Sequence, residues 1–276
     1  MAKTVRIGVA APSSRIDADL AALVEKAVAE LCGDRVELVF HPQCFLASGH
    51  FAGADEARAA AFLEIANDAS FDALWFARGG YGSARIAPLV LPRLEASARA
   101  KAYLGYSDAG ALLAAMYGAG FSNLAHGPVV ADLRRERGEA AFARALRWLM
   151  ARASDALEPS IQPGMKHAAF NITILSHLLG TPWQPDLSGH VLMLEEVSEH
   201  HYRIDRALGQ ITSNANIRKA AGIRLGRCSL IPPNDPEFGQ TEEEIARHWC
   251  AVSGIPYLGR ADIGHDADNK IVPFGA

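Results

Sequence analysis

Cysteine is scarce in this sequence, and the few cysteines form no recognisable pair. They are Cys32, Cys44, Cys228 and Cys250. None belongs to a CxxC motif, and their separations do not match the ligand spacing of a structural zinc site. This pattern excludes a small disulfide-stapled module. It favours reduced, mostly buried thiols, as is usual in a cytosolic protein.

Long hydrophobic runs and an excess of positive charge are also missing. Dense apolar stretches such as Gly110–Phe121 are well short of the ~18 residues that a membrane-spanning helix needs. Near the N-terminus only Ile7–Ala11 is apolar before Pro12, which is too short for the core of a signal peptide. With 27 Lys and Arg against 31 Asp and Glu, the net charge of −4 does not favour a nucleic-acid partner. We therefore expect a cytoplasmic protein that binds neither nucleic acid nor membrane.

The order of strand and helix patterns indicates an α/β fold. In the first half of the chain, short apolar runs typical of buried strands alternate with segments of helical periodicity. The expected strands are Val5–Ala10, Val36–Phe40, Phe71–Ala77 and Tyr103–Leu104, and the expected helices are Leu20–Leu31, Asp55–Asn67, Asp108–Tyr117 and Glu139–Arg152. This order predicts a Rossmann- or flavodoxin-like parallel sheet with helices on both faces. In such a sheet, ligands gather at the carboxyl ends of the strands.

A change in amino-acid composition near residue 153 divides the chain. Ala153–Lys166 contains Ser, Pro and Gly but few periodic apolar residues, and we interpret it as a linker. It separates an N-terminal α/β domain (residues 1–152) from a smaller mixed α/β C-terminal domain (residues 167–276). The second part is expected to contain helices over Asn171–Leu179 and Tyr202–Ile211, strands over His190–Glu195 and Ile223–Leu225, a helix that begins with a Thr241–Glu244 capping box, and a last strand within Ile255–Ile263.

Ser107 is the first candidate for chemistry, because it lies on an expected strand-to-helix turn. Such a turn exposes the hydroxyl and directs the N–H groups of the next helix toward a developing oxyanion. The motif Gly105-Tyr106-Ser107-Asp108-Ala109 lacks the second glycine of the G-x-S-x-G elbow, so an α/β-hydrolase is not supported. The structural alternative is that Ser107 is only a helix N-cap, a position that favours serine.

The glycine-rich segment Arg78-Gly79-Gly80-Tyr81-Gly82 is the second candidate, because it follows an expected strand. It has neither the G-x-G-x-x-G spacing of a dinucleotide site nor the Lys-Ser/Thr pair of a phosphate-binding loop. Its glycines would instead let backbone N–H groups approach a substrate carbonyl closely. The structural alternative is a tight turn, which glycine also serves.

A nucleophilic serine needs a base, and several histidines compete for that role. His265 has the most favourable context, because it follows a strand within the turn-rich loop Gly264–Asn269. His126, His200 and His201 are the competitors.

Glu195 and Glu196 are the candidates for the carboxylate that orients such a base. They end an apolar strand, so one is expected to point into the site and the other to solvent. Metal sites are weakly indicated: Glu199-His200-His201 does not form H-E-x-x-H, and Asp266–Asn269 lacks the central glycine of a calcium loop. We therefore expect neither a metal nor an organic cofactor.

Taken together, these motifs resemble the LD-carboxypeptidase family of serine peptidases, the muramoyltetrapeptide carboxypeptidases. The resemblance extends over almost the whole chain, and the order and spacing of the short motifs make it specific. They are Ala11-Pro12-Ser13-Ser14, Asp55-Glu56-Ala57-Arg58, Ala77-Arg78-Gly79-Gly80-Tyr81-Gly82, Gly105-Tyr106-Ser107-Asp108, His126-Gly127-Pro128, Leu179-Gly180-Thr181-Pro182, Leu194-Glu195-Glu196, Tyr202-Arg203-Ile204-Asp205-Arg206, Gly264-His265 and Pro273-Phe274-Gly275.

The family uses a Ser–Glu–His triad, with the serine in the N-terminal domain and the other two residues in the C-terminal domain. By motif match, the resemblance implies Ser107 as nucleophile, His265 as general base and Glu195 as its orienting carboxylate, with Glu196 as a minor alternative. It also implies an oxyanion hole formed by the backbone N–H of Asp108 and that of Gly79 or Gly80.

The activity implied by the resemblance is hydrolysis of the L,D-amide bond that releases terminal D-Ala from murein tetrapeptide during peptidoglycan recycling. The reaction would pass through an acyl-enzyme, and the family suggests a homodimer. An alternative in the same superfamily is a microcin C self-immunity peptidase, which cleaves a peptidyl or aminoacyl group from a nucleotide-like antibiotic. That reading calls for an aromatic-rich loop to stack the nucleobase, but Trp183 and Trp249 lie in no obvious stacking loop. A non-catalytic small-molecule binding protein is the alternative of a different class.

Overall fold

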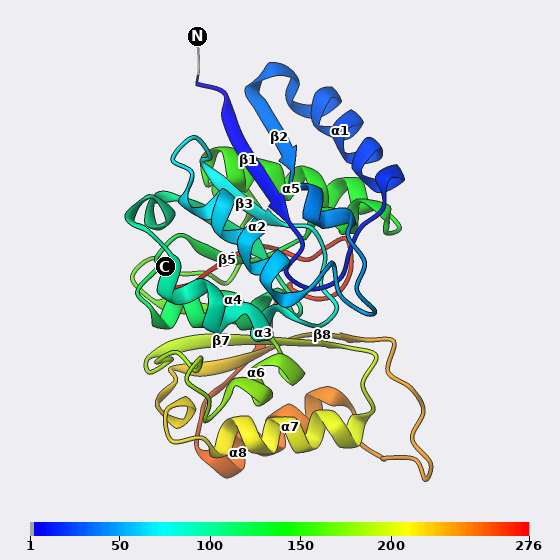
Figure 1. Ribbon diagram of the computed structural model, residues 1–276. Helices are drawn as coiled ribbons and strands as arrows, with labels where there is room; N and C mark the ends of the chain where they lie inside the picture. The colour runs from blue at the N-terminus through cyan, green and yellow to red at the C-terminus, as the bar shows by residue number, and fades with distance from the viewer. Residues whose placement is uncertain (1–2, 276) are drawn as a thin grey trace.

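The computed structural model describes residues 3–275, which are arranged around two β-sheets (Figure 1). The first sheet has the strand order β10-β5-β4-β3-β1-β2, and every pairing is parallel except that of β10 with β5. Its strands are β1 (Val5–Ala10), β2 (Val36–Phe40), β3 (Ala73–Phe76), β4 (Ala102–Gly105), β5 (Leu124–His126) and β10 (Val272–Pro273). The predicted α/β fold class is therefore confirmed.

Helices cover both faces of the first sheet because its strands are apolar on both sides. In β3, Ala73 and Trp75 belong to the core that includes apolar residues of α1 and α5. Leu74 and Phe76 point the other way, into the core formed with α2, α3 and α4. These helices are α1 (Ala18–Cys32), α2 (Asp55–Asn67), α3 (Ser83–Val90), α4 (Ala109–Gly118) and α5 (Gly138–Ala151).

The second sheet has the order β6-β7-β8-β9 and is parallel throughout. Its strands are β6 (Lys166–Asn171), β7 (His190–Val197), β8 (Gly222–Ser229) and β9 (Tyr257–Arg260), and its helices are α6 (Ile172–Leu178), α7 (His201–Ser213) and α8 (Glu242–Ser253). Leu192 and Leu194 of β7 share a core with these helices, whereas Val191 and Met193 pack with Ile263 on the opposite face. Figure 1 shows α7 and α8 on the side of this sheet that lies away from the first sheet.

The end of the described chain returns to the first sheet. Val272 of β10 pairs with His126 of β5, and Leu157 forms a bridge with Ile271. The sequence predicted its last strand within residues 255–263, where β9 lies. It did not predict β10, because a two-residue strand that contains proline carries no periodic signal. The assignment of residues 153–166 as a linker between two domains stays a prediction.

Side chains cap the N-termini of α1 and α8. The Leu20 N–H donates to Asp17 Oδ1 over 2.8 Å, so Asp17 caps α1. Thr241 and Glu244 form the predicted reciprocal capping box of α8. No helix within residues 3–275 combines the length and apolarity needed to cross a bilayer.

Candidate active site

Ser107 occupies a sharp turn between β4 and α4, at the carboxyl end of the strand. Its φ of +59° lies in the left-handed region, which residues with side chains rarely adopt. A Cβ on Gly105 would lie 2.9 Å from the Phe76 ring and 3.0 Å from the Cβ of Ala109, so the residue two positions before Ser107 has no room for a side chain. The N-cap of α4 is Asp108, so the alternative interpretation of Ser107 as the N-cap is wrong.

The buried carboxylate of Asp108 ties this turn to two neighbouring loops. Asp108 Oδ2 accepts hydrogen bonds from the hydroxyl of Ser13 and, over 2.8 Å, from the N–H of Ser83. The Ser83 hydroxyl in turn donates to the Asp108 carbonyl. Two segments that are distant in the sequence, one with Ser13 and one with Ser83, therefore hold the backbone turn that presents Ser107.

Gly79 and Gly80 follow β3, and Gly79 lies against the Ser107 turn. A Cβ on Gly79 would lie 2.9 Å from Ser107 Oγ, so any larger residue would crowd the hydroxyl. Gly80 has a φ of +114°, and a Cβ there would collide with Ser14. Within residues 3–275, the backbone N–H groups of Gly79, Gly80 and Asp108 donate to no protein acceptor. They remain free to bind a ligand.

His265 is held by a direct hydrogen bond to Glu195. His265 Nδ1 and Glu195 Oε2 are 2.5 Å apart, and both side chains are almost fully buried. Burial disfavours the imidazolium, but the charge of Glu195 and its hydrogen bond outweigh this effect and raise the pKa of His265 above its usual value. A proton on Nδ1 that faces the carboxylate leaves the Nε2 lone pair free to accept another proton.

An irregularity in β8 lies opposite Glu195. Leu194 pairs with Leu225 but Glu196 pairs with Cys228, so β8 carries one extra residue here. A Cβ on Gly226 would lie 2.9 Å from the Cβ of Glu195, which explains why this position needs glycine.

Glu196 points to the opposite face of the second sheet and is also buried. It accepts hydrogen bonds from Asn171 Nδ2 over 2.6 Å and from the N–H and hydroxyl of Thr173 over 2.9 and 2.7 Å. The expectation that one of the two glutamates points to solvent is wrong, because α6 covers the second face. Of this pair, only Glu195 contacts His265.

The loop that carries His265 is anchored from both halves of the chain. Arg227 of β8 binds Asp262 over 2.5 Å and Asp266 over 2.8 Å. Arg144 of α5 donates to the carbonyls of Ala267 and Asn269, and Arg135 donates to the carbonyl of His265 over 2.9 Å. Sequence reasoning missed these three arginines, because each is an isolated charge without a motif.

The competing histidines lie in other environments. His126 is buried, and burial lowers its pKa to about 4, so it is neutral near pH 7. His200 stacks on Tyr202 and His201 stacks on Phe238, both at the start of α7. Asp266, in the loop considered as a calcium site, is ion-paired with Arg227. Among residues 3–275, no three His, Cys, Asp or Glu side chains are grouped so that they could hold a metal.

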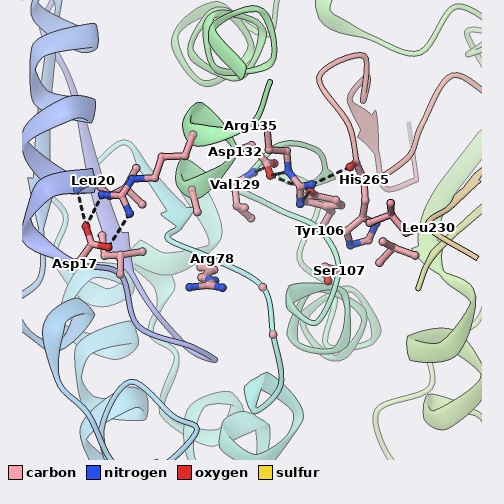
Figure 2. Close-up of a pocket in the computed structure, with 16 residues that line it drawn as sticks. Asp17, Leu20, Arg78, Tyr106, Ser107, Val129, Asp132, Arg135, Leu230 and His265 are labelled. Carbon is pink, nitrogen blue, oxygen red and sulfur yellow. Dashed lines mark hydrogen bonds and ion pairs between the residues drawn. The ribbon is translucent and has the colours of Figure 1, made fainter. Parts of the chain in front are cut away.

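Ser107 and His265 line the same cavity, which has a volume of about 700 Å³. Figure 2 shows them on one side of this cavity, Asp17 and Leu20 on the other, and Arg78 between them. Glu195 lies behind the His265 ring, outside the lining. No hydrogen bond joins Ser107 to His265 among the described residues, and such bonds often tighten only when substrate binds. The structure therefore brings the three predicted residues into one region. The Ser107 hydroxyl and the His265 imidazole face the same cavity, and Glu195 is hydrogen-bonded to the imidazole.

Comparisons with known proteins show which family the chain resembles. Residues 7–127 match the family model for the LD-carboxypeptidase N-terminal domain, and residues 168–276 match that for the C-terminal domain. A putative carboxypeptidase of Synechocystis is 33% identical over 87% of this chain and 80% of its own. A murein tetrapeptide carboxypeptidase of Pseudomonas aeruginosa is 29% identical over 74% of this chain and 70% of its own.

Two solved structures share the fold. A muramoyltetrapeptide carboxypeptidase from Oxalobacter formigenes is 23% identical, with a TM-score of 0.79 over 97% of this chain and 93% of its own. The microcin C7 self immunity protein MccF is 18% identical, with a TM-score of 0.82 over 100% of this chain and 92% of its own. The family assignment depends on the matches to both domain models. This chain belongs to the LD-carboxypeptidase family and is a serine-type carboxypeptidase.

Proposed function

We propose that this enzyme hydrolyses the L,D-amide bond that joins a terminal D-Ala to murein tetrapeptide, with Ser107, His265 and Glu195 as its catalytic triad. One observation carries this proposal. The His265 ring is bonded through Nδ1 to buried Glu195, and it shares a cavity with Ser107 on its strained turn. Nucleophile, base and orienting carboxylate are thus each supplied by a side chain with the required chemistry.

In the proposed mechanism, Ser107 Oγ attacks the carbonyl carbon of the scissile amide while His265 Nε2 takes the hydroxyl proton. Glu195 keeps the proton on Nδ1 and stabilises the imidazolium that forms. His265 then protonates the leaving amine, which frees D-Ala and leaves an acyl ester on Ser107. Water, deprotonated by the same imidazole, hydrolyses that ester and restores the hydroxyl.

The oxyanion of each tetrahedral intermediate needs donors that no protein acceptor already occupies. Among the described residues, the N–H of Asp108 and the N–H of Gly79 or Gly80 meet this condition, and Gly79 lies beside Ser107. The N-terminus of α4 adds a favourable dipole at the same place. One such donor lowers the barrier by about 3–4 kcal/mol in comparable sites.

Two features favour a murein peptide over the nucleotide-like alternative. Relatives that align over most of this chain are named murein tetrapeptide carboxypeptidase and probable murein peptide carboxypeptidase. No tryptophan is among the described residues that line the cavity, and the indole of Trp249 instead donates to Asp205. The tryptophans considered for stacking a nucleobase therefore lie outside the described lining of this cavity.

The test is release of D-Ala from murein tetrapeptide by the purified enzyme, followed by chromatography of the free amino acid. The matched control is the diastereomer with a terminal L-Ala. We expect release from the L,D-peptide only. Labelling of Ser107 by a fluorophosphonate without any D-Ala release would contradict the substrate assignment. Absence of labelling in folded protein would favour the non-catalytic binding protein.

The pH dependence of the reaction follows from the environment of His265. The base works only when neutral, so kcat/KM is expected to fall as the pH drops through the pKa of His265. Because Glu195 raises this pKa above 6.5, the midpoint of the acidic limb should lie above 6.5. His126, with a pKa of about 4, stays neutral through this range. A pH–rate profile measures the midpoint, and a value below 6.5 would contradict the proposed pairing.

The resemblance also supports a homodimer in the cytoplasm, and we include both in the proposal. Sedimentation equilibrium is expected to give twice the mass of the chain. A monomer that is fully active at all concentrations would overturn the oligomeric part alone.

A further inference from the structure

Three arginines line the cavity beside the predicted triad, and two of them are already neutralised. Arg134 makes two hydrogen bonds to Asp17, over 2.6 and 2.5 Å. Arg135 binds buried Asp132 over 2.6 Å and also donates to the carbonyl of His265. These two guanidinium groups stabilise the wall of the cavity and have little capacity left for a ligand.

Arg78 is different, because its guanidinium has no hydrogen-bonded partner among the described residues and only a longer-range attraction to Asp17. Within residues 3–275 its side chain makes no hydrogen bond, ion pair or aromatic contact, although it lines the cavity and is exposed. Figure 2 shows it in the open space between Asp17 and Ser107. Among the described lining residues, Arg134 and Arg135 are each paired directly with a carboxylate, and His265 is neutral in its active form. Arg78 is therefore the lining arginine without a direct ion pair, although the nearby Asp17 partly balances its charge.

The position of Arg78 is fixed relative to the reacting hydroxyl. Arg78 directly precedes Gly79, where an added Cβ would lie 2.9 Å from Ser107 Oγ. Consecutive Cα atoms are about 3.8 Å apart, and an extended arginine side chain is longer than that separation. In a peptide that ends in alanine, the terminal carboxylate carbon is only three bonds from the scissile carbonyl carbon. A carbonyl placed at Ser107 therefore brings the terminal carboxylate within reach of this guanidinium.

We propose that Arg78 binds the terminal carboxylate of the leaving residue and so makes the enzyme an exopeptidase. This inference rests on the proposed function, because it assumes that the acyl group is transferred to Ser107. A guanidinium binds a carboxylate through two parallel N–H···O bonds, which also fixes its orientation. A peptide that continues past the scissile bond has a neutral amide in that place and leaves the guanidinium unpaired.

The experiment compares two murein tetrapeptides that differ only at their C-terminus, one with a free carboxylate and one with a carboxamide. The parent enzyme is expected to prefer the free acid in kcat/KM. Arg78→Gln should lower kcat/KM for the acid by about 10- to 100-fold, as expected for the loss of a charged hydrogen-bonded pair. It should change hydrolysis of the amide little, so the preference for the acid collapses. Arg78→Lys should restore part of the preference, because it keeps the charge but not the planar fork.

Arg134→Gln is the matched control, because Arg134 lines the same cavity but is paired with Asp17. It is expected to affect the acid and the amide substrates by the same factor. A fluorophosphonate that still labels Ser107 in Arg78→Gln shows that the fold and the triad remain intact.

The outcomes separate this inference from the proposed function. If the parent hydrolyses both peptides and Arg78→Gln retains the full preference for the acid, the carboxylate site is elsewhere and the inference is overturned, while the triad stands. If the parent hydrolyses neither peptide and neither protects Ser107 from labelling, the proposed function fails and the inference fails with it. If Arg134→Gln instead removes the preference, the site belongs to Arg134.

Discussion

Ser107→Ala is expected to reduce kcat for D-Ala release by at least ~10⁴-fold, the size of loss seen when a serine nucleophile is removed. Without the hydroxyl no acyl-enzyme can form, and the remaining rate reflects only substrate binding and the backbone donors. Release of D-Ala under single-turnover conditions measures the loss, and a fluorophosphonate probe should no longer label the protein.

This variant should fold normally. The Ser107 hydroxyl makes no hydrogen bond within residues 3–275, and the turn is held by Asp108 through Ser13 and Ser83. If the variant has the same thermal unfolding temperature as the parent enzyme, the loss of activity comes from the missing hydroxyl and not from a damaged fold. Ser122→Ala, which removes an exposed hydroxyl, is the matched control and should keep full activity. Parent-like turnover by Ser107→Ala would eliminate the proposed mechanism.

The carboxyl ends of β3 and β4 could be located from the sequence alone. Each strand is a short buried apolar run that stops at glycine, and parallel strands end at the same edge of a sheet. Ser107 and the pair Gly79-Gly80 each follow one of these strands, and in the structure Gly79 lies against the Ser107 hydroxyl. Local pattern was sufficient here because both segments belong to adjacent strands of one sheet.

The partner of Ser107 could not be found in this way. Glu195 and His265 are separated by 70 positions and meet only because the loop after β9 folds back over β7. Hydrophobic periodicity cannot predict a contact between residues so far apart in the sequence. His265 was therefore preferred to His126 as the general base because of its turn-rich context and the family resemblance. Both histidines are buried, but their surroundings differ: the pKa of His126 is lowered by burial, whereas His265 lines the cavity and is hydrogen-bonded to Glu195.

Glu196 shows where alternation along a strand misleads. Neighbouring residues in β7 do point to opposite faces, as the sequence argument assumed. Both faces of the second sheet are covered, however, one by α6 and its neighbours and the other by the segment that carries His265. The second carboxylate is therefore buried among Asn171 and Thr173, and burial raises its pKa. Opposite faces do not imply opposite exposure in a sheet that has cores on both sides.

The glutamates give the second large prediction. Glu195→Gln is expected to lower kcat by about 10³- to 10⁴-fold, because the imidazolium formed in the transition state loses its buried counter-charge. The other oxygen of Glu195, Oε1, is buried without a hydrogen-bond partner among the described residues, so an amide NH₂ placed there would have no acceptor. Glutamine is therefore expected to turn its NH₂ toward His265 Nδ1, which favours the wrong tautomer in addition to removing the charge.

A pH–rate profile of this variant separates the electrostatic role from a structural one. In the parent, the Glu195 charge outweighs the effect of burial on His265. Once the charge is removed, burial acts alone and lowers the pKa of His265, so the acidic limb of kcat/KM should shift to lower pH. A merely structural role would reduce the rate without moving the limb.

Glu196→Gln is the matched control, with the same chemical change one residue away on the opposite face. It keeps oxygen and nitrogen atoms near Asn171 and Thr173 and does not touch His265. We expect a far smaller loss of kcat and an unshifted acidic limb. If Glu196→Gln were the more damaging variant and alone moved the limb, the orienting role would pass from Glu195 to Glu196.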